Sequence, residues 1–201
     1  MNKKKYLKRL STLFVVFILG FTVGYSKDEW GYELLFAQLT SNNSATKLDV
    51  ELNNVELCFT PASQCTGVVV KTILEARESI YVQAYGLTSS PIAKALIAAH
   101  KSGVIVKVLL DRSNINNKNS KMNELIEAGI DVKIDRVTGI AHNKVMIIDE
   151  SYVVTGSFNF TNAADLRNTE NLLVIKDKKL AKAYLENWQA REQINELKGN
   201  L

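Results

Sequence analysis

Apolar residues in the middle of the chain follow two alternating periods, that of a β-strand and that of a helix. Apolar runs bounded by polar turns predict strands over 50–59, 79–85, 104–110 and 130–134. Helical spacing of apolar residues predicts helices over 67–77, 90–101 and 121–128. Pro91 suits the first position of the second helix, and Gly103 suits its end. Strands that alternate with helices in this way indicate an α/β fold with crossover helices.

The last third of the chain has a different order, in which strands follow one another closely. Strands are predicted over 144–149 and 152–155, joined by a tight turn at Glu150-Ser151, and again over 171–175. A long amphipathic helix over 178–197 follows, with Leu185 and Trp188 on its apolar side. We therefore expect a mixed, largely parallel sheet flanked by helices.

The N-terminus differs from the rest of the chain in charge and in hydropathy. A cluster of lysines and an arginine ends at Arg9, and an apolar run over 13–24 follows it. A basic stretch before a short apolar run is typical of an export signal, whereas a membrane span needs about 20 apolar residues. We expect residues 1–26 to be an export signal or N-terminal anchor, 27–48 a linker, and 49–201 the catalytic domain. The protein is then secreted or periplasmic, either released or held at a membrane by this segment.

The net charge of +4 comes from the same N-terminal segment. Five of the 25 basic residues lie in the first 26 positions, which hold no acidic residue, so 20 basic residues face 21 acidic ones in the rest. A body close to neutrality argues against broad electrostatic capture of nucleic acid, because charge neutralisation supplies most of the non-specific affinity. A local basic patch remains compatible with these numbers.

Cys58 and Cys65 are the only cysteines, and a turn-like stretch lies between them. In an exported protein, two cysteines at this spacing predict one disulfide. Two buried free thiols are the alternative. We expect no metal site here, because neither a histidine nor a second cysteine pair lies near.

The pattern His142-x-Lys144 offers groups that can act on a phosphodiester. Two residues that are two positions apart on a strand point to the same face. An imidazole, with an ordinary pKa of about 6.5, can serve as nucleophile or as acid, and an ammonium can neutralise developing phosphoryl charge. Ser157 and Asn159, which follow Gly156, could donate hydrogen bonds to the same oxygens. His100, the other histidine, is expected to be a solvated residue near a helix end.

The full pattern H-x-K-x4-D-x6-G-S-x-N, from His142 to Asn159, resembles the phospholipase D superfamily, including its short members with a single copy of the motif. The resemblance extends from about Cys58 to Trp188. It implies that His142 is the nucleophile and forms a phosphohistidine. We expect no metal or other cofactor, because the sequence has no cluster of carboxylates or cysteines to bind a metal.

The resemblance also implies roles for the neighbouring residues. Lys144 and Asn159 would bind the phosphate with the help of Ser157. Glu170 would correspond to a carboxylate that orients the catalytic histidines, which would fix their tautomer and raise their basicity. Asp149 and Gly156 are expected to be structural parts of the motif, because Asp149 lies seven residues from His142 and alternation places it on the opposite face.

A single motif supplies one histidine, whereas the reaction uses two, a nucleophile and a general acid. We therefore expect a two-fold homodimer with one shared site. The favoured activity is that of a phospholipase D, acting on phosphatidylcholine-type lipids at a membrane surface. The alternative is an exported endonuclease that cleaves DNA, and a second alternative is a silent protein that only binds phosphate or membranes. Phe158 and Phe160 favour the lipid, unless they are core residues, and a possible basic rim favours DNA (Lys133, Arg136 and Arg167).

Overall fold

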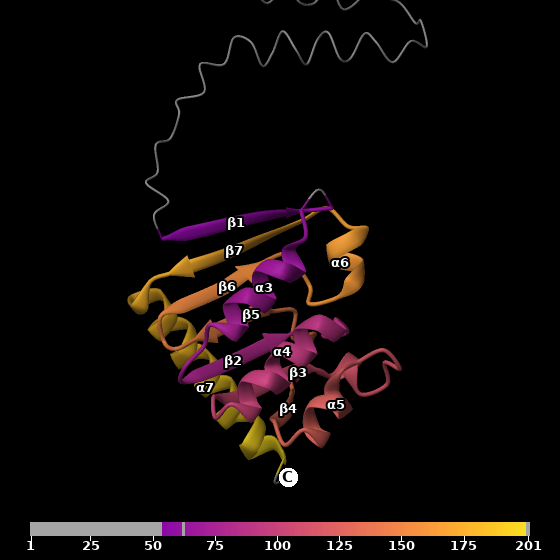
Figure 1. The fold of residues 1–201 in the computed structure, drawn as a ribbon. Helices are drawn as coiled ribbons and strands as arrows, with labels where there is room; N and C mark the ends of the chain where they lie inside the picture. The colour runs from indigo at the N-terminus through magenta and orange to yellow at the C-terminus, as the bar shows by residue number, and fades with distance from the viewer. Residues whose placement is uncertain (1–53, 62, 200–201) are drawn as a thin grey trace, which may run out of the picture. The chain divides into compact units, whose positions relative to one another are not determined.

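Seven strands form a single sheet in the part of the chain that this computed structural model describes, residues 54–61 and 63–199 (Figure 1). The strand order is β1-β7-β6-β5-β2-β3-β4. The strands are β1 (Val55–Thr60), β2 (Ser79–Ala84), β3 (Ile105–Asp111), β4 (Asp131–Asp135), β5 (Lys144–Ile148), β6 (Tyr152–Gly156) and β7 (Glu170–Lys176). The expected export segment 1–26 and linker 27–48 lie outside the described residues.

The sheet is mixed, as expected, but the expectation that it is largely parallel is wrong. Only the pairs β2–β3 and β3–β4 are parallel, and these are the strands joined by crossover helices. The pairs β1–β7, β7–β6, β6–β5 and β5–β2 are antiparallel. The turn between β5 and β6 is too short for a crossover, so these two strands must run in opposite directions.

Helices cover both faces of the sheet. One face packs against α3 (Cys65–Leu74), α4 (Ser90–Lys101) and α5 (Met122–Glu127), and the other against α7 (Lys178–Gly199). All five residues of β5 are buried, because helices cover this strand on both sides. On the α7 side, Trp188 lies in the core and its Nε1 donates a hydrogen bond to the Val82 carbonyl at 2.9 Å. No helix among the described residues is long and apolar enough to cross a membrane.

Two short elements were not predicted. The 3₁₀ turn η1 (Arg112–Asn114) follows β3, and α6 (Asn162–Leu166) lies between β6 and β7. The Thr161 hydroxyl caps α6 by accepting a hydrogen bond from the Ala164 N–H at 3.1 Å.

The turn between β5 and β6 lies one residue earlier than predicted, with Asp149 and Glu150 at its centre. Both have a positive φ, 51° and 48°, and the Ser151 N–H donates to the Ile148 carbonyl at 3.0 Å. Two successive positive φ values at the centre of a turn suit the twist of an antiparallel hairpin, and aspartate tolerates this conformation better than most residues.

Asp149 also connects this turn to the start of β2. Its carboxylate accepts hydrogen bonds from the backbone N–H groups of Arg77, Glu78 and Ser79, at 2.9, 2.8 and 3.0 Å. This end of β5 is remote from His142, which precedes the opposite end of the strand. The contacts of Asp149 are therefore those of a scaffold residue.

A disulfide joins Cys58 to Cys65, with a Cα–Cα distance of 5.6 Å. It connects the last part of β1 to the first residue of α3. Near the same end of β1, Thr60 pairs with Glu170 at the start of β7. The bridge thus lies beside the sheet edge where β2, β3 and β4 end and β5 and β7 begin.

Candidate active site

His142 and Lys144 lie at this sheet edge, where Lys144 is the first residue of β5 and His142 lies two residues before it. The His142 side chain is exposed, whereas Lys144 is buried, with 8% of its surface accessible. The Lys144 ammonium Nζ donates a hydrogen bond to the backbone carbonyl of His142 at 2.9 Å. Because β5 is buried on both faces, it holds the lysine firmly beside an imidazole that solvent or substrate can reach.

Tyr85, which sequence reasoning missed, lies between these two groups. Its ring contacts the His142 ring edge-to-face, with centroids 4.6 Å apart, and the Lys144 ammonium lies 5.3 Å from its centroid. The Tyr85 N–H donates to the Asn143 carbonyl at 2.8 Å, which extends the β2–β5 pairing. Only this antiparallel pairing reveals the role of Tyr85, because nothing in the sequence places residue 85 beside residue 142.

Two opposing effects act on the pKa of the Lys144 ammonium. Burial lowers the pKa of its ammonium, and the nearby carboxylate of Glu170 raises it, with a net result below the ordinary value. A partly desolvated ammonium interacts more strongly with an incoming anion than a solvated one does. Lys144 is therefore suited to bind a phosphate group.

Glu170 is fixed by a small hydrogen-bond network. The Ser157 hydroxyl donates to Glu170 Oε2 at 2.6 Å, and the Asn168 amide donates to Oε1 at 3.0 Å. Ser157 Oγ in turn accepts from the backbone N–H of Asn171 at 3.1 Å. The Ser157 hydroxyl thus holds a carboxylate in this structure, whereas the sequence suggested that it would bind phosphate directly.

Gly156 allows this network to form. Its φ is +144°, and a Cβ at this position would overlap the Asn171 carbonyl oxygen and lie 2.9 Å from Asn171 Oδ1. The close approach brings the N–H groups of Ser157 and Phe158 to that same carbonyl, at 3.1 and 3.2 Å. Any residue with a side chain would push β6 away from β7 at the site.

Asn159 completes the group of predicted residues. Its Oδ1 is buried and has no hydrogen-bond partner among the described residues. It lies against Gly86, the residue after Tyr85, where a Cβ would approach to 3.9 Å. The amide of Asn159 is therefore close to the Tyr85 segment and has unused hydrogen-bonding capacity. Together, the structure gathers His142, Lys144, Ser157, Asn159 and Glu170 at one edge of the sheet.

Several other expectations about the surroundings need correction. Phe158 and Phe160 are fully buried core residues and cannot contact a lipid. The Lys133 ammonium is engaged by Glu192 at 2.8 Å, so this residue is part of an ion-pair network on α7. His100 is half-buried, with its Nδ1 enclosed, near the end of α4 that lies away from the site.

The described residues contain no group of three or more His, Cys, Asp or Glu placed to bind a metal ion.

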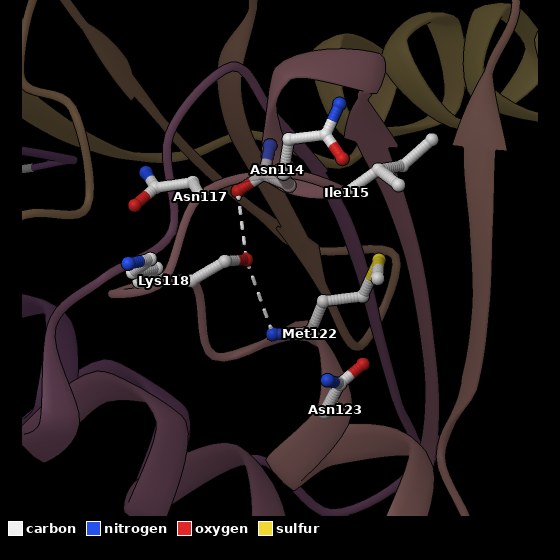
Figure 2. A pocket seen from close by; sticks show the side chains of 8 residues that line it. Asn114, Ile115, Asn117, Lys118, Met122 and Asn123 are labelled. Atoms are coloured by element: carbon white, nitrogen blue, oxygen red, sulfur yellow. Dashed lines mark hydrogen bonds between the residues drawn. The ribbon is translucent and has the colours of Figure 1, made fainter.

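A hollow of about 180 Å³ lies beside the site, in the loop between β3 and α5 (Figure 2). Half of its lining residues are asparagines, and the others are Ile115, Lys118, Ser120 and Met122. The buried Asn114 forms its inner wall, and Figure 2 shows the hydrogen bond between Asn114 Oδ1 and the Ser120 hydroxyl, which measures 3.1 Å. Asn114 Nδ2 donates to the Tyr85 carbonyl at 2.7 Å, so this residue connects the lining of the hollow to the Tyr85 segment.

Residues 69–191 match the family described as "Cardiolipin synthase, PLD-like domain". The chain is 47% identical over 199 residues to the phospholipase D of Rickettsia bellii. This alignment covers 96% of this chain and 99% of that protein. It is 30% identical over 133 residues to the mitochondrial cardiolipin hydrolase of Mus musculus, 66% of this chain and 60% of that protein. The solved structure of the phospholipase D family member Nuc from Salmonella typhimurium is 40% identical and superposes with a TM-score of 0.67. The superposition covers 69% of this chain and 93% of the Nuc chain.

The chain belongs to this family of PLD-like domains. The expected membership of the phospholipase D superfamily is thereby confirmed. The protein is an enzyme, a phosphodiesterase of the hydrolase class.

Proposed function

We propose that the protein is a phospholipase D that acts without a metal, through a phosphohistidine formed on His142. The observation that carries this proposal is the pairing of an exposed imidazole with a buried ammonium, both in contact with the ring of Tyr85. Lys144 and the amide of Asn159 would bind the non-bridging oxygens, and Glu170 would hold the ammonium charged and help to orient the histidines. These groups supply the positive charge and the donors that a phosphodiester needs.

The reaction proceeds in two displacements. A ring nitrogen of His142 attacks the phosphorus, and the bond to the leaving alkoxide breaks as the P–N bond forms, while a second imidazole gives a proton to the leaving oxygen. Water then attacks the phosphohistidine, loses a proton to that second imidazole, and releases the phosphomonoester and free His142. For a phosphatidylcholine-type lipid the products are the free head group and phosphatidate.

The second imidazole comes, in this proposal, from another copy of the chain. The sequence contains two histidines, and His100 lies near the end of α4 away from the site. Large apolar side chains of β1 and α6 are exposed in the single chain, Phe59 at 57% and Leu166 at 67%. A two-fold dimer with one shared site would bury such side chains and bring the two His142 residues together.

Mixing wild-type and His142→Ala chains, after unfolding and refolding together, tests the shared site. The activity should follow the square of the wild-type fraction, since only pairs of wild-type chains hold two histidines. A linear dependence on the wild-type fraction would show that each chain acts alone.

The lipid substrate is supported by the similarity to Rickettsia bellii phospholipase D over nearly the whole length of both chains. A membrane surface is then a partner, and export by residues 1–26 would bring the enzyme to it. The test is hydrolysis of phosphatidylcholine vesicles and of single-stranded DNA by the purified protein in EDTA. Release of head group with no DNA cleavage is the expected result. Cleavage of DNA alone would identify an exported nuclease, and hydrolysis of neither would favour a silent binding protein.

A further inference from the structure

Asp111, the last residue of β3, is a buried carboxylate that the proposed reaction does not use. Only 1% of its surface is exposed. Its Oδ1 accepts a hydrogen bond from the Ser113 N–H at 2.9 Å and so caps η1. Its Oδ2 accepts from the Ala141 N–H at 2.8 Å. Ala141 immediately precedes His142, so one oxygen of this carboxylate holds the backbone next to the proposed nucleophile.

The Asp111 carboxylate carries a negative charge despite its burial. Burial alone would raise the pKa of Asp111, but the N–H groups of Ser113 and Ala141, together with the positive charge of Arg112, outweigh it and hold the pKa below the ordinary value. The carboxylate is therefore ionised at neutral pH. Hydrogen bonds from backbone N–H groups to a carboxylate are stronger than those between neutral groups.

The segment 141–143 needs such support, because residues 136–143 form neither a helix nor a strand. One hydrogen bond to the backbone holds each of its three residues. Asp111 accepts from the Ala141 N–H, the Lys144 ammonium donates to the His142 carbonyl, and the Tyr85 N–H donates to the Asn143 carbonyl. The contact of Asp111 is the one that connects this segment to β3.

We propose that Asp111 is a positioning residue, which sets the place of the His142 imidazole through the Ala141 N–H. This inference rests on the proposed function of His142 as the nucleophile. The neighbouring Asn114, which Figure 2 shows lining the hollow, holds the Tyr85 backbone in a similar way. Its amide donates a hydrogen bond to the Tyr85 carbonyl. A displacement of about 1 Å at a reacting group can cost roughly 100-fold in rate.

The adjacent strand provides a matched control. Asp135 is the direct partner of Asp111 in the β3–β4 register, and it is equally buried at 2%. Its carboxylate binds Gln83, Arg191 and Asn195, and so holds α7 instead of the His142 segment. Loss of either carboxylate should destabilise the fold, but only the loss of Asp111 should move His142.

The experiment compares Asp111→Asn with Asp135→Asn on the full chain, with bis(p-nitrophenyl) phosphate as substrate, below the unfolding temperature of both. Asp111→Asn should lower kcat by roughly 10- to 100-fold with little change in KM, while Asp135→Asn should keep kcat within about twofold. Equal kcat values for the two variants would overturn the proposal. If Asp111→Asn does not fold, Asp111→Ser replaces it, because serine can still cap η1 but is too short to reach Ala141.

A second measurement does not depend on activity. The Tyr85 ring lies against His142, so its ring current shifts the NMR signals of the imidazole. Asp111→Asn should move these signals, and Asp135→Asn should leave them in place. Unmoved signals in Asp111→Asn would refute the positioning role even if the wild-type protein hydrolysed nothing. Moved signals in a protein without hydrolytic activity would refute the proposed function alone.

Discussion

Replacing Asp149 by alanine separates a scaffold role from a catalytic one within the H-x-K-x4-D motif. The Asp149 carboxylate accepts three backbone hydrogen bonds, from Arg77, Glu78 and Ser79. The first two donors are exposed and can be solvated by water after the substitution, whereas Ser79 is buried. A hydrogen bond to a charged group is worth about 1.5–3 kcal/mol when buried, and an exposed one contributes less. Alanine at a φ of 51° adds about 1 kcal/mol of backbone strain.

We therefore expect Asp149→Ala to lower the free energy of unfolding by about 3 kcal/mol. For a domain of this size, that corresponds to a fall in Tm of roughly 6–12 °C. The kcat of the folded variant at 25 °C should remain within about twofold of the wild type, because Asp149 lies at the far end of β5 from His142. Thermal unfolding by circular dichroism and hydrolysis of bis(p-nitrophenyl) phosphate measure the two quantities. An unchanged Tm together with a large loss of kcat would show that Asp149 takes part in the chemistry and is not a scaffold residue.

Three further substitutions probe the site and its support. Gly156→Ala should destabilise the protein by about 3 kcal/mol and lower kcat, because its Cβ would overlap the Asn171 carbonyl, whereas Gly139→Ala, with open space around it, should do neither. Glu170→Gln removes the charge that raises the Lys144 pKa, so the loss of activity at high pH should begin at a lower pH, and an unmoved alkaline limb would contradict the coupling. Arg191→Leu leaves the Asp135 carboxylate buried without its cation, so chemical denaturation should show a loss of about 3 kcal/mol, partly restored by adding Asp135→Asn.

The strand and helix pattern could be predicted from the sequence because each element has a clear apolar period. The parallel half of the sheet, β2 to β4, follows directly from the two crossover helices. Of the antiparallel half, only the β5–β6 hairpin could be derived from the elements, because its turn is too short for a crossover. The partner of β1 is β7, which lies more than 100 residues later in the chain, and no local pattern encodes such a pairing. The turn at Asp149 was misplaced by one residue because either pair of polar residues there suits a hairpin.

The residues of the site fall into two groups in the same way. His142, Lys144, Ser157 and Asn159 lie in one short segment, so their spacing identified them. Tyr85 and Asp111 come from other strands and reach the site only through the β2–β5 and β2–β3 pairings. An aspartate at the end of a buried strand suggests a cap, but its contact with Ala141 depends on a loop whose course the sequence does not determine. Residues that support a site from elsewhere in the chain therefore need the structure.

A trapped covalent intermediate would show whether His142 is the nucleophile. Wild-type protein is mixed with bis(p-nitrophenyl) phosphate in EDTA, quenched in alkali within the first turnover, and analysed by mass spectrometry. We expect one p-nitrophenyl phosphoryl group on His142, and neither the adduct nor hydrolysis in His142→Ala. Hydrolysis that persists in His142→Ala, or an adduct on another residue, would show that His142 is not the nucleophile.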